Sequence, residues 1–396
     1  MTFFKDISLS AFTAGFVAVL VGFTSSVAIV FQAATAFNAT PAQIASWMWA
    51  LGIGMGLCTV LPSLYYKKPI MVAWSTPGAA VLATAGVTGG FSMAEAVGAF
   101  MVSAALITLF GVTGWFEKLL SRIPVAIASA LLAGVLARFG MSGFTAAQTA
   151  LPLVLLMLTV YLLGRRFMPR YSVVVTLMAG VAYAAVRGEL AWPTVNFTLT
   201  LPVFVMPQFS FSAVVSLAIP LFVVTMASQN LPGVAAIRAT GYEGQIPVSK
   251  VITLTGLATL ALAPFGAFAL NLSAITAAIV MGKEAHPNPD KRYTAAVSCG
   301  LIYLVIGVFG AAVTSLLAAF PKELVAAIAG LALLGTIGAG LAAAVKDESH
   351  REAALITFLV TLSGVVIAGI GSAFWGVVAG ALALFVQQYG QPKPQH

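Results

Sequence analysis

Long apolar runs, separated by short charged or Pro/Gly-rich breaks, fill almost all of the 396 residues. A membrane-spanning helix needs about 20 mostly apolar residues. The runs are apolar on every side, whereas the strands of an outer-membrane barrel alternate between apolar and polar positions. The pattern therefore predicts an all-α polytopic membrane protein. Fourteen candidate transmembrane segments begin near Leu9, Pro41, Pro69, Met93, Ile123, Thr149, Tyr171, Ala213, Ser249, Phe265, Tyr293, Glu323, Glu352 and Ser372.

Composition and charge agree with this interpretation. The chain is 60% hydrophobic and 8% charged, against about 25% charged in soluble domains. Basic residues stand singly or in pairs at the ends of apolar runs, which indicates membrane topology rather than nucleic-acid binding. With a cytoplasmic amino terminus, all but three of the 19 basic residues fall in cytoplasmic loops, the exceptions being Arg138, Arg187 and Lys322. The positive-inside rule therefore predicts a multi-pass protein of the bacterial inner membrane with both termini cytoplasmic.

The segment count predicts an inverted repeat. The longest external connection, residues 187–211, leaves seven segments on each side, and an odd number per half turns the second half upside down in the membrane. We therefore expect 14 transmembrane segments arranged as 7+7 inverted repeats. Three residue pairs support the repeat, at an offset of 195 residues for the first and 197 for the other two: Pro69 with Pro264, Pro124 with Pro321, and Gln32 with Gln229.

The third and tenth segments are interrupted. PIMVAWSTPG (69–78) and PFGAFALNLS (264–273) each open with a stretch suited to extended chain and continue as an Ala-rich helical run. In the third segment Thr76 has N-cap chemistry and Pro77 suits the first helical position. In the tenth, Asn271 or Ser273 is the available cap. We expect two half-helices whose N-termini point at each other near the midplane; simple proline kinks in continuous helices are the alternative.

Such an arrangement creates a polar site inside the membrane. Unpaired N–H groups and the positive ends of two helix dipoles attract an anion, and irregular backbone at this depth is tolerated only where it is buried in protein or lines a cavity. Adjacent amides in the eighth segment are the strongest candidates for binding, with interhelical hydrogen bonding as the alternative. The predicted substrate-binding residues are Ser25, Gln32, Trp74, Ser75, Thr76, Gly78, Gln229, Asn230, Asn271 and Ser273.

Catalytic chemistry has no support in the sequence. All eleven carboxylates lie at or near the ends of predicted segments, so no buried acidic proton relay is visible. Zinc-ligand spacing, a Ser/His/Asp set and a Gly-rich phosphate loop are absent from the sequence. We therefore expect neither an enzyme nor a bound metal or cofactor.

Five stretches together resemble the bacterial benzoate/proton symporter family: SSVAIVFQAA (25–34), WSTPG (74–78), SQNLPG (228–233), ALNLSAITAAI (269–279) and EAHPNPDKRY (284–293). The resemblance covers essentially the full chain. This family is similar in fold to the nucleobase/ascorbate (uracil) transporters and the sulfate/bicarbonate carriers. That likeness implies a core domain of segments 1–4 and 8–11 (residues 1–120 and 191–320) and a gate domain of segments 5–7 and 12–14 (residues 121–190 and 321–396).

The resemblance also implies a function. Nucleobase carriers have glutamates in the eighth and tenth segments that bind the base or couple protons, whereas the matching positions here hold Gln229 and the Leu270-Asn271 pair. We therefore expect a secondary active transporter that imports benzoate or a similar aromatic carboxylate with a proton, by elevator-like movement of the core against the gate. Uncoupled or channel-like anion passage, a nucleobase or other organic-anion carrier, and a membrane enzyme or sensor are the alternatives. A homodimer is left open.

Overall fold

The computed structural model describes residues 3–24, 26–120, 123–190, 198–310, 320–365, 367 and 372–388, and these residues are largely α-helical. Eight helices in these ranges are long and apolar enough to cross a membrane. They are α4 (Pro41–Tyr66), α6 (Met93–Thr113), α8 (Val125–Thr145), α9 (Ala147–Phe167), the run from α11 to α13 (Phe211–Ala239), α14 (Val248–Leu262) with the 3-10 turn that follows it (together Val248–Phe265), α16 (Tyr293–Val308) with the 3-10 turn that precedes it (together Pro289–Val308), and α18 (Lys322–Ala344).

Shorter helices account for the other segments. They are α1 (Phe3–Asp6), α2 (Leu9–Thr24), α3 (Val27–Ala36), α5 (Thr76–Gly89), α7 (Trp115–Leu120), α10 (Ser172–Val186), α15 (Ile275–Met281), α19 (Arg351–Ser363) and α20 (Ser372–Gln388). Each predicted segment contains a helix that begins near its expected start, except the third and tenth, where a strand comes first. The all-α membrane architecture is confirmed, whereas the 7+7 arrangement of fourteen segments stays a prediction.

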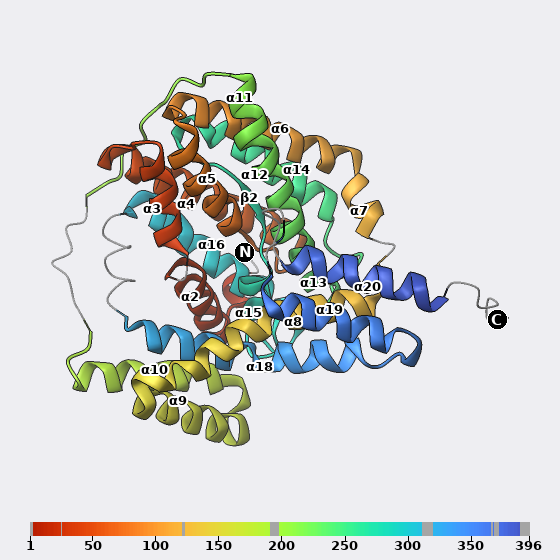
Figure 1. Cartoon of the computed structure of the whole chain (residues 1–396). Helices are drawn as coiled ribbons and strands as arrows, with labels where there is room; N and C mark the ends of the chain where they lie inside the picture. Colours follow the sequence, from red (N-terminus) through yellow and green to blue (C-terminus); the bar gives the residue numbers. More distant parts are fainter. Residues whose placement is uncertain are drawn as a thin grey trace.

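The helices pack in two groups. In one group α16 lies along α4 and α2, α14 lies along α6, and α3 packs on α5; in the other, α8 packs on α18 and α19, α19 on α20, and α9 on α10. Figure 1 shows most of the first group in the upper part of the view and the second along the bottom. Contact between α4 and α16 is so close that a Cβ on Gly52 would lie 2.6 Å from the backbone nitrogen of Gly307. The two groups contain helices expected in the core and gate domains, whose boundaries stay a prediction.

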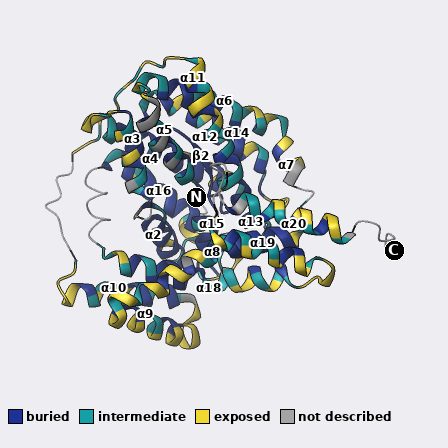
Figure 2. Ribbon diagram, viewed as in Figure 1, coloured by how far each residue is buried: buried dark blue, intermediate teal, exposed yellow. Residues whose placement is uncertain are grey.

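Apolar side chains cover the outward faces of the peripheral helices. Leu151, Leu155 and Leu162 of α9 are each about half exposed, at 52%, 50% and 57%. Figure 2 shows many exposed residues on α9 and on α20. A soluble monomer rarely exposes apolar surface of this extent, so these faces are suited to contact with lipid.

Two short strands lie at the centre of the fold. β1 (Val72–Trp74) and β2 (Leu270–Leu272) form a two-stranded antiparallel ribbon in which Ala73 lies opposite Asn271. Each strand leads into a half-helix, β1 into α5 and β2 into α15. The antiparallel pairing means that the third and tenth segments run in opposite directions. Because an extended strand precedes each half-helix, the alternative of proline kinks in two continuous helices is wrong.

The ribbon has a local two-fold symmetry in its hydrogen bonds. The Ser75 N–H donates to the Ala269 carbonyl at 3.0 Å, and the Ser273 N–H donates to the Met71 carbonyl at the same distance. Equivalent residues are therefore 198 positions apart, and the predicted offset of 195 for this segment is wrong. That offset was anchored on Pro69 and Pro264, but Pro264 lies in the 3-10 turn η4 (Ala263–Phe265), three residues farther from its strand than Pro69 is.

A second predicted pair has matching structure. Pro124 and Pro321 are the N-cap residues of α8 and α18, with φ/ψ of −56/147° and −54/135°. Proline suits a helix start because its fixed φ is already helical and its missing N–H costs no intrahelical bond. The two helices that they open pack directly against each other.

Candidate functional site

Side chains from three surrounding helical segments hold the outer edges of the ribbon. A two-stranded ribbon inside a membrane leaves outward N–H groups that have no water to bond. Thr59 of α4 accepts from the Val72 N–H at 3.2 Å, and Thr259 of α14 accepts from the Leu270 N–H at 3.1 Å. Asn230 accepts from the Leu272 N–H at 2.9 Å. The backbone geometry of the site is therefore set by polar side chains of the helices that enclose it.

The start of α5 is capped by Ser75, not by Thr76. The Ser75 Oγ accepts from the Gly78 N–H at 3.1 Å, and Thr76 and Pro77 are the first two helical residues. The prediction that Thr76 is the cap is wrong by one residue, because Ser75 already has the extended backbone that a cap requires. Since Ser75 uses the Gly78 N–H and proline has none, the Thr76 N–H is the donor left without an acceptor in the described chain.

The α12–α13 segment passes directly beside this helix start. The Thr225 hydroxyl at the end of α12 (Ile219–Thr225) donates to the Ser75 Oγ at 3.0 Å. A Cβ added to Gly78 would lie 2.7 Å from Leu221 Cδ1 and 2.8 Å from the Ser75 Oγ. Gly78 is therefore needed for close approach, and Thr225 is a member of the site that was not among the residues predicted from the sequence.

A π-helical turn, η3 (Met226–Asn230), lies between the two half-segments. Such turns are rare and often mark functional sites. Its neighbour Thr225 contacts the start of α5, and its last residue Asn230 contacts β2, so Gln229 lies between them. Gln229 is partly exposed and its side chain has no hydrogen bond within the described residues. The sequence feature that marks this π-helical turn is Pro232, because proline has no N–H to donate to a carbonyl of the preceding helical turn.

The two amides of the eighth and tenth segments have different roles. Asn230 is fully buried and both ends of its side chain are bonded, the oxygen to β2 and the nitrogen to Met226 Sδ at 3.1 Å. Asn271 is also fully buried, and its Nδ2 donates to the Leu272 carbonyl at 2.8 Å. Its Oδ1, however, has no partner in the part of the chain that the structure describes. Asn230 therefore positions the ribbon, and Asn271 retains an open acceptor.

Neither predicted residue caps α15. The helix begins after Ala274 without a side-chain cap, and the Ser273 Oγ accepts from the Thr276 hydroxyl at 2.7 Å instead. Asn271 lies within the strand, too far ahead of the first helical turn to cap it. The prediction that Asn271 or Ser273 caps this half-helix is therefore wrong.

The remaining predicted residues lie at different distances from the ribbon. Trp74 is buried in β1, where its indole N–H donates to the Ser26 Oγ at 3.0 Å and its ring lies 5.5 Å from that of Phe23. Gln32 is exposed on α3. Ser25 lies outside the described residues. The structure thus brings together the residues of the interrupted segments and η3, but it does not place Gln32 among them.

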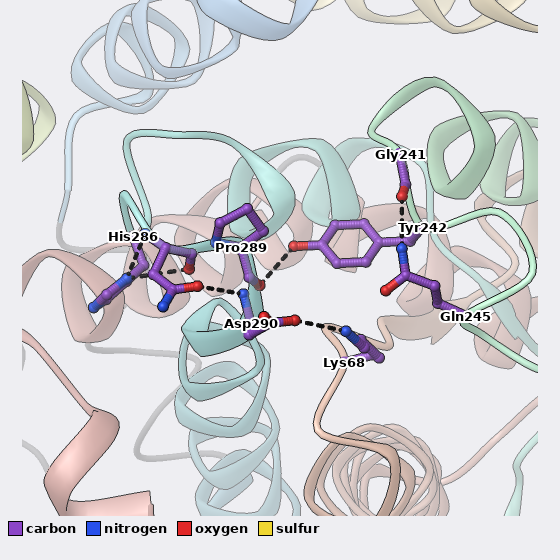
Figure 3. A network of polar contacts seen from close by, with 8 residues as sticks. Lys68, Gly241, Tyr242, Gln245, His286, Pro289 and Asp290 are labelled. Atoms are coloured by element: carbon purple, nitrogen blue, oxygen red, sulfur yellow. Dashed lines mark hydrogen bonds and ion pairs between the residues drawn. The ribbon is translucent and has the colours of Figure 1, made fainter.

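The EAHPNPDKRY stretch forms a polar loop cluster with residues of two other loops (Figure 3). Lys68 Nζ pairs with Asp290 Oδ1 at 2.7 Å, which lowers the pKa of that carboxyl. The Tyr242 hydroxyl donates to the Pro289 carbonyl at 2.9 Å. These contacts join the loops after α4, α13 and α15, so the cluster links three loops at one end of the bundle.

Arg292 connects this polar loop cluster to α15. It is 6% exposed, and its guanidinium donates to the carbonyls of His286 and Met281, each at 2.8 Å. Met281 is the last residue of α15, where a cation is favourable because of the helix dipole. The cluster therefore fixes the end of α15 opposite the ribbon.

Known proteins resemble this chain over nearly its full length. It is 46% identical over 373 residues to the inner membrane protein YdcO of Escherichia coli (strain K12), covering 94% of both chains. It is 41% identical over 382 residues to the benzoate membrane transport protein of Acinetobacter baylyi, covering 96% of both chains.

Solved structures align over the chain at low sequence identity. The transmembrane domain of the cyanobacterium bicarbonate transporter BicA covers 96% of this chain and 97% of its own, at 15% identity and a TM-score of 0.46. SLC26A9 covers 97% of this chain and 66% of its own, at 10% identity and a TM-score of 0.49.

The family model for benzoate membrane transport proteins matches residues 5–386, and the chain therefore belongs to this family of membrane transporters, which are not enzymes.

Proposed function

We propose that this protein is a secondary active transporter of the bacterial inner membrane that imports benzoate or a similar aromatic carboxylate together with a proton. The observation that carries the proposal is the buried antiparallel ribbon from which α5 and α15 begin. It creates a polar position between two interrupted segments, where irregular backbone is tolerated if it is buried in protein or lines a cavity. Family membership and the 41% identical benzoate transport protein support the choice of substrate.

The substrate carboxyl group would lie between the start of α5 and the π-helical turn. Thr76 supplies an N–H that has no acceptor among the described residues, at the positive end of a 14-residue helix. Gln229 supplies an amide that is partly exposed and unbonded to the described residues. Neutral donors of this kind bind a single carboxyl group without the desolvation cost of burying a charged side chain. Ser75 and Asn230 would position this site, and Gly78 would allow the close approach.

Movement of one helix group against the other would deliver the substrate. The ribbon is held by α4, α14 and η3, which belong to the group expected to form the core, while α8, α9, α18, α19 and α20 pack mainly among themselves. The local two-fold symmetry of the ribbon and the matching proline caps of α8 and α18 support an inverted repeat. An elevator-like movement of residues 1–120 and 191–320 against residues 121–190 and 321–396 would carry the site across the membrane.

Uptake by proteoliposomes tests this function. Labelled benzoate should accumulate when the lumen is alkaline relative to the outside, and a protonophore should abolish the accumulation. Uptake that ignores the pH gradient contradicts proton coupling, and benzoate-dependent current without a coupled ion favours the channel-like alternative. Competition by nucleobases but not by aromatic acids would favour the nucleobase alternative.

Substitution of Gln229 locates the site. Q229A should lose most benzoate binding while the protein remains folded. Q245A is the matched control, because Gln245 is exposed in the loop after α13 and bonds only to the Gly241 carbonyl within the described residues. Equal affinity of the two variants would place the substrate elsewhere.

A further inference from the structure

Asn271 has a buried acceptor that no described residue satisfies. The residue is 0% exposed, its Nδ2 donates to the Leu272 carbonyl at 2.8 Å, and its Oδ1 has no partner within the described ranges. Rotating the amide by half a turn would place Oδ1 against that carbonyl oxygen, so that two acceptors would face each other. The hydrogen-bond geometry therefore fixes which atom is open. The open atom is an acceptor, and only a donor can satisfy it.

The position of Asn271 connects this acceptor with the proposed substrate site. Asn271 lies directly opposite Ala73 in the ribbon, and directly opposed side chains lie on the same face of a strand pair. Ala73 is partly exposed, as are Thr76 at the start of α5 and Gln229 in η3. The Asn271 side chain therefore lies on the same ribbon face as partly exposed Ala73, and its open oxygen is itself buried.

The polar groups around the ribbon are neutral. The described side chains that bond to the ribbon or to Ser75 are hydroxyls and an amide, from Ser26, Thr59, Thr259, Thr225 and Asn230. A carboxylate anion has acceptors only, so it would meet the Asn271 oxygen with repulsion. A protonated carboxylic acid has one O–H donor and one carbonyl acceptor, which matches an open acceptor beside open donors.

We propose that Asn271 recognises the aromatic acid in its protonated form. The acid O–H donates to Asn271 Oδ1, and the acid carbonyl accepts from Gln229 or from the Thr76 N–H. This inference rests on the proposed function and adds to it the chemical form of the substrate. The transported proton is then the proton of the acid itself: the carboxylate takes it up before binding and loses it after release. No titratable side chain is needed in the site for coupling.

Ligand binding to the purified wild-type protein distinguishes recognition of the protonated acid from recognition of the carboxylate. Isothermal titration with benzoate should give an affinity that falls about tenfold for each pH unit above the pKa of the acid, because one proton is bound with the ligand. Benzamide, a neutral molecule with both a donor and an acceptor, should bind with no pH dependence. Benzenesulfonate, which stays anionic and has acceptors only, should not bind.

The results that overturn the inference differ from those that overturn the proposed function. Benzoate affinity that is independent of pH, or benzenesulfonate binding as tight as that of benzoate, refutes recognition of the protonated acid but leaves benzoate transport standing. Absence of benzoate binding at every pH, including acidic pH, refutes the proposed function itself.

A variant tests the role of Asn271 directly. N271L keeps the approximate volume and removes the acceptor, so benzamide affinity should fall about tenfold or more. S298A is the control, because the Ser298 hydroxyl is buried in α16 and, within the described part of the chain, donates only to the Thr294 carbonyl of its own helix. Unchanged benzamide affinity in folded N271L refutes the inference. If N271L does not fold, the comparison of benzamide with benzenesulfonate on the wild-type protein still decides.

Discussion

Substitution of two threonines on opposite edges of the ribbon measures how much their hydrogen bonds contribute to the free energy of unfolding. Thr59 and Thr259 accept the N–H groups of Val72 and Leu270, and all four residues are 0% exposed. A Thr→Val substitution keeps the shape of the side chain and removes the acceptor. Each buried N–H then loses its partner, which costs about 1–3 kcal/mol. Because the two bonds occupy symmetric places in the ribbon, T59V and T259V should lower the free energy of unfolding by similar amounts.

Thr255 provides the matched control within α14. It is also 0% exposed, but its hydroxyl donates back to the Ile252 carbonyl of its own helix at 2.9 Å. T255V removes only this local bond, so its cost should be about 0.5 kcal/mol or less. Reversible unfolding of the purified variants in bicelles measures the differences, and benzoate affinity measures the distortion of the site. The reasoning is refuted if T259V is as stable as T255V, since the ribbon would then not depend on this acceptor.

Two further predictions concern packing and the contact between helix groups. G78A should lower benzoate affinity at least about tenfold in a binding titration, because its Cβ would meet Leu221 Cδ1 at 2.7 Å and the Oγ of the cap residue Ser75 at 2.8 Å; the double variant G78A/L221A removes only the first of these contacts, so it should recover only part of that loss. Arg165 of α9 pairs with Glu284 of the α15–α16 loop at 2.6 Å, with side chains 44% and 11% exposed. A double-mutant cycle of R165Q and E284Q should give a coupling of about 0.5–1 kcal/mol in unfolding free energy. If the helix groups move, each single variant should also change the rate of uptake and leave benzoate affinity unchanged.

Local signals in the sequence mark the starts of two of the helices that the apolar runs predicted. Thr40 and Gln43 form a capping box at the start of α4, and Ser92 and Glu95 form another at the start of α6. Such signals act over three or four residues, so the sequence contains all the information that they need. Continuous apolar runs extend the helices from these starts, which is why the predicted positions agree closely with the structure.

The ribbon depends on contacts that no local pattern contains. Its register is set by Thr59 and Thr259, which are distant in sequence from each other, and by Asn230 on a third segment. The sequence predicted extended chain before each half-helix, because the prolines and polar residues that interrupt the apolar runs are local features. It did not predict which residues pair, and an alignment on Pro69 and Pro264 gave an offset three residues too small.

Asn230 and Asn271 show why the composition of a site does not reveal the role of each member. Both are buried amides, Asn230 in the eighth segment and Asn271 in the interrupted tenth, and the sequence assigned both to substrate binding. In the structure the Asn230 oxygen accepts from the Leu272 N–H, while the Asn271 nitrogen donates to the Leu272 carbonyl. Two amides thus bind the two polar groups of one strand residue, and of the two only Asn271 has an oxygen that no described residue bonds. A membrane site can in this way obtain a fixed backbone and a specific acceptor from neutral groups, without the desolvation cost of a buried carboxylate.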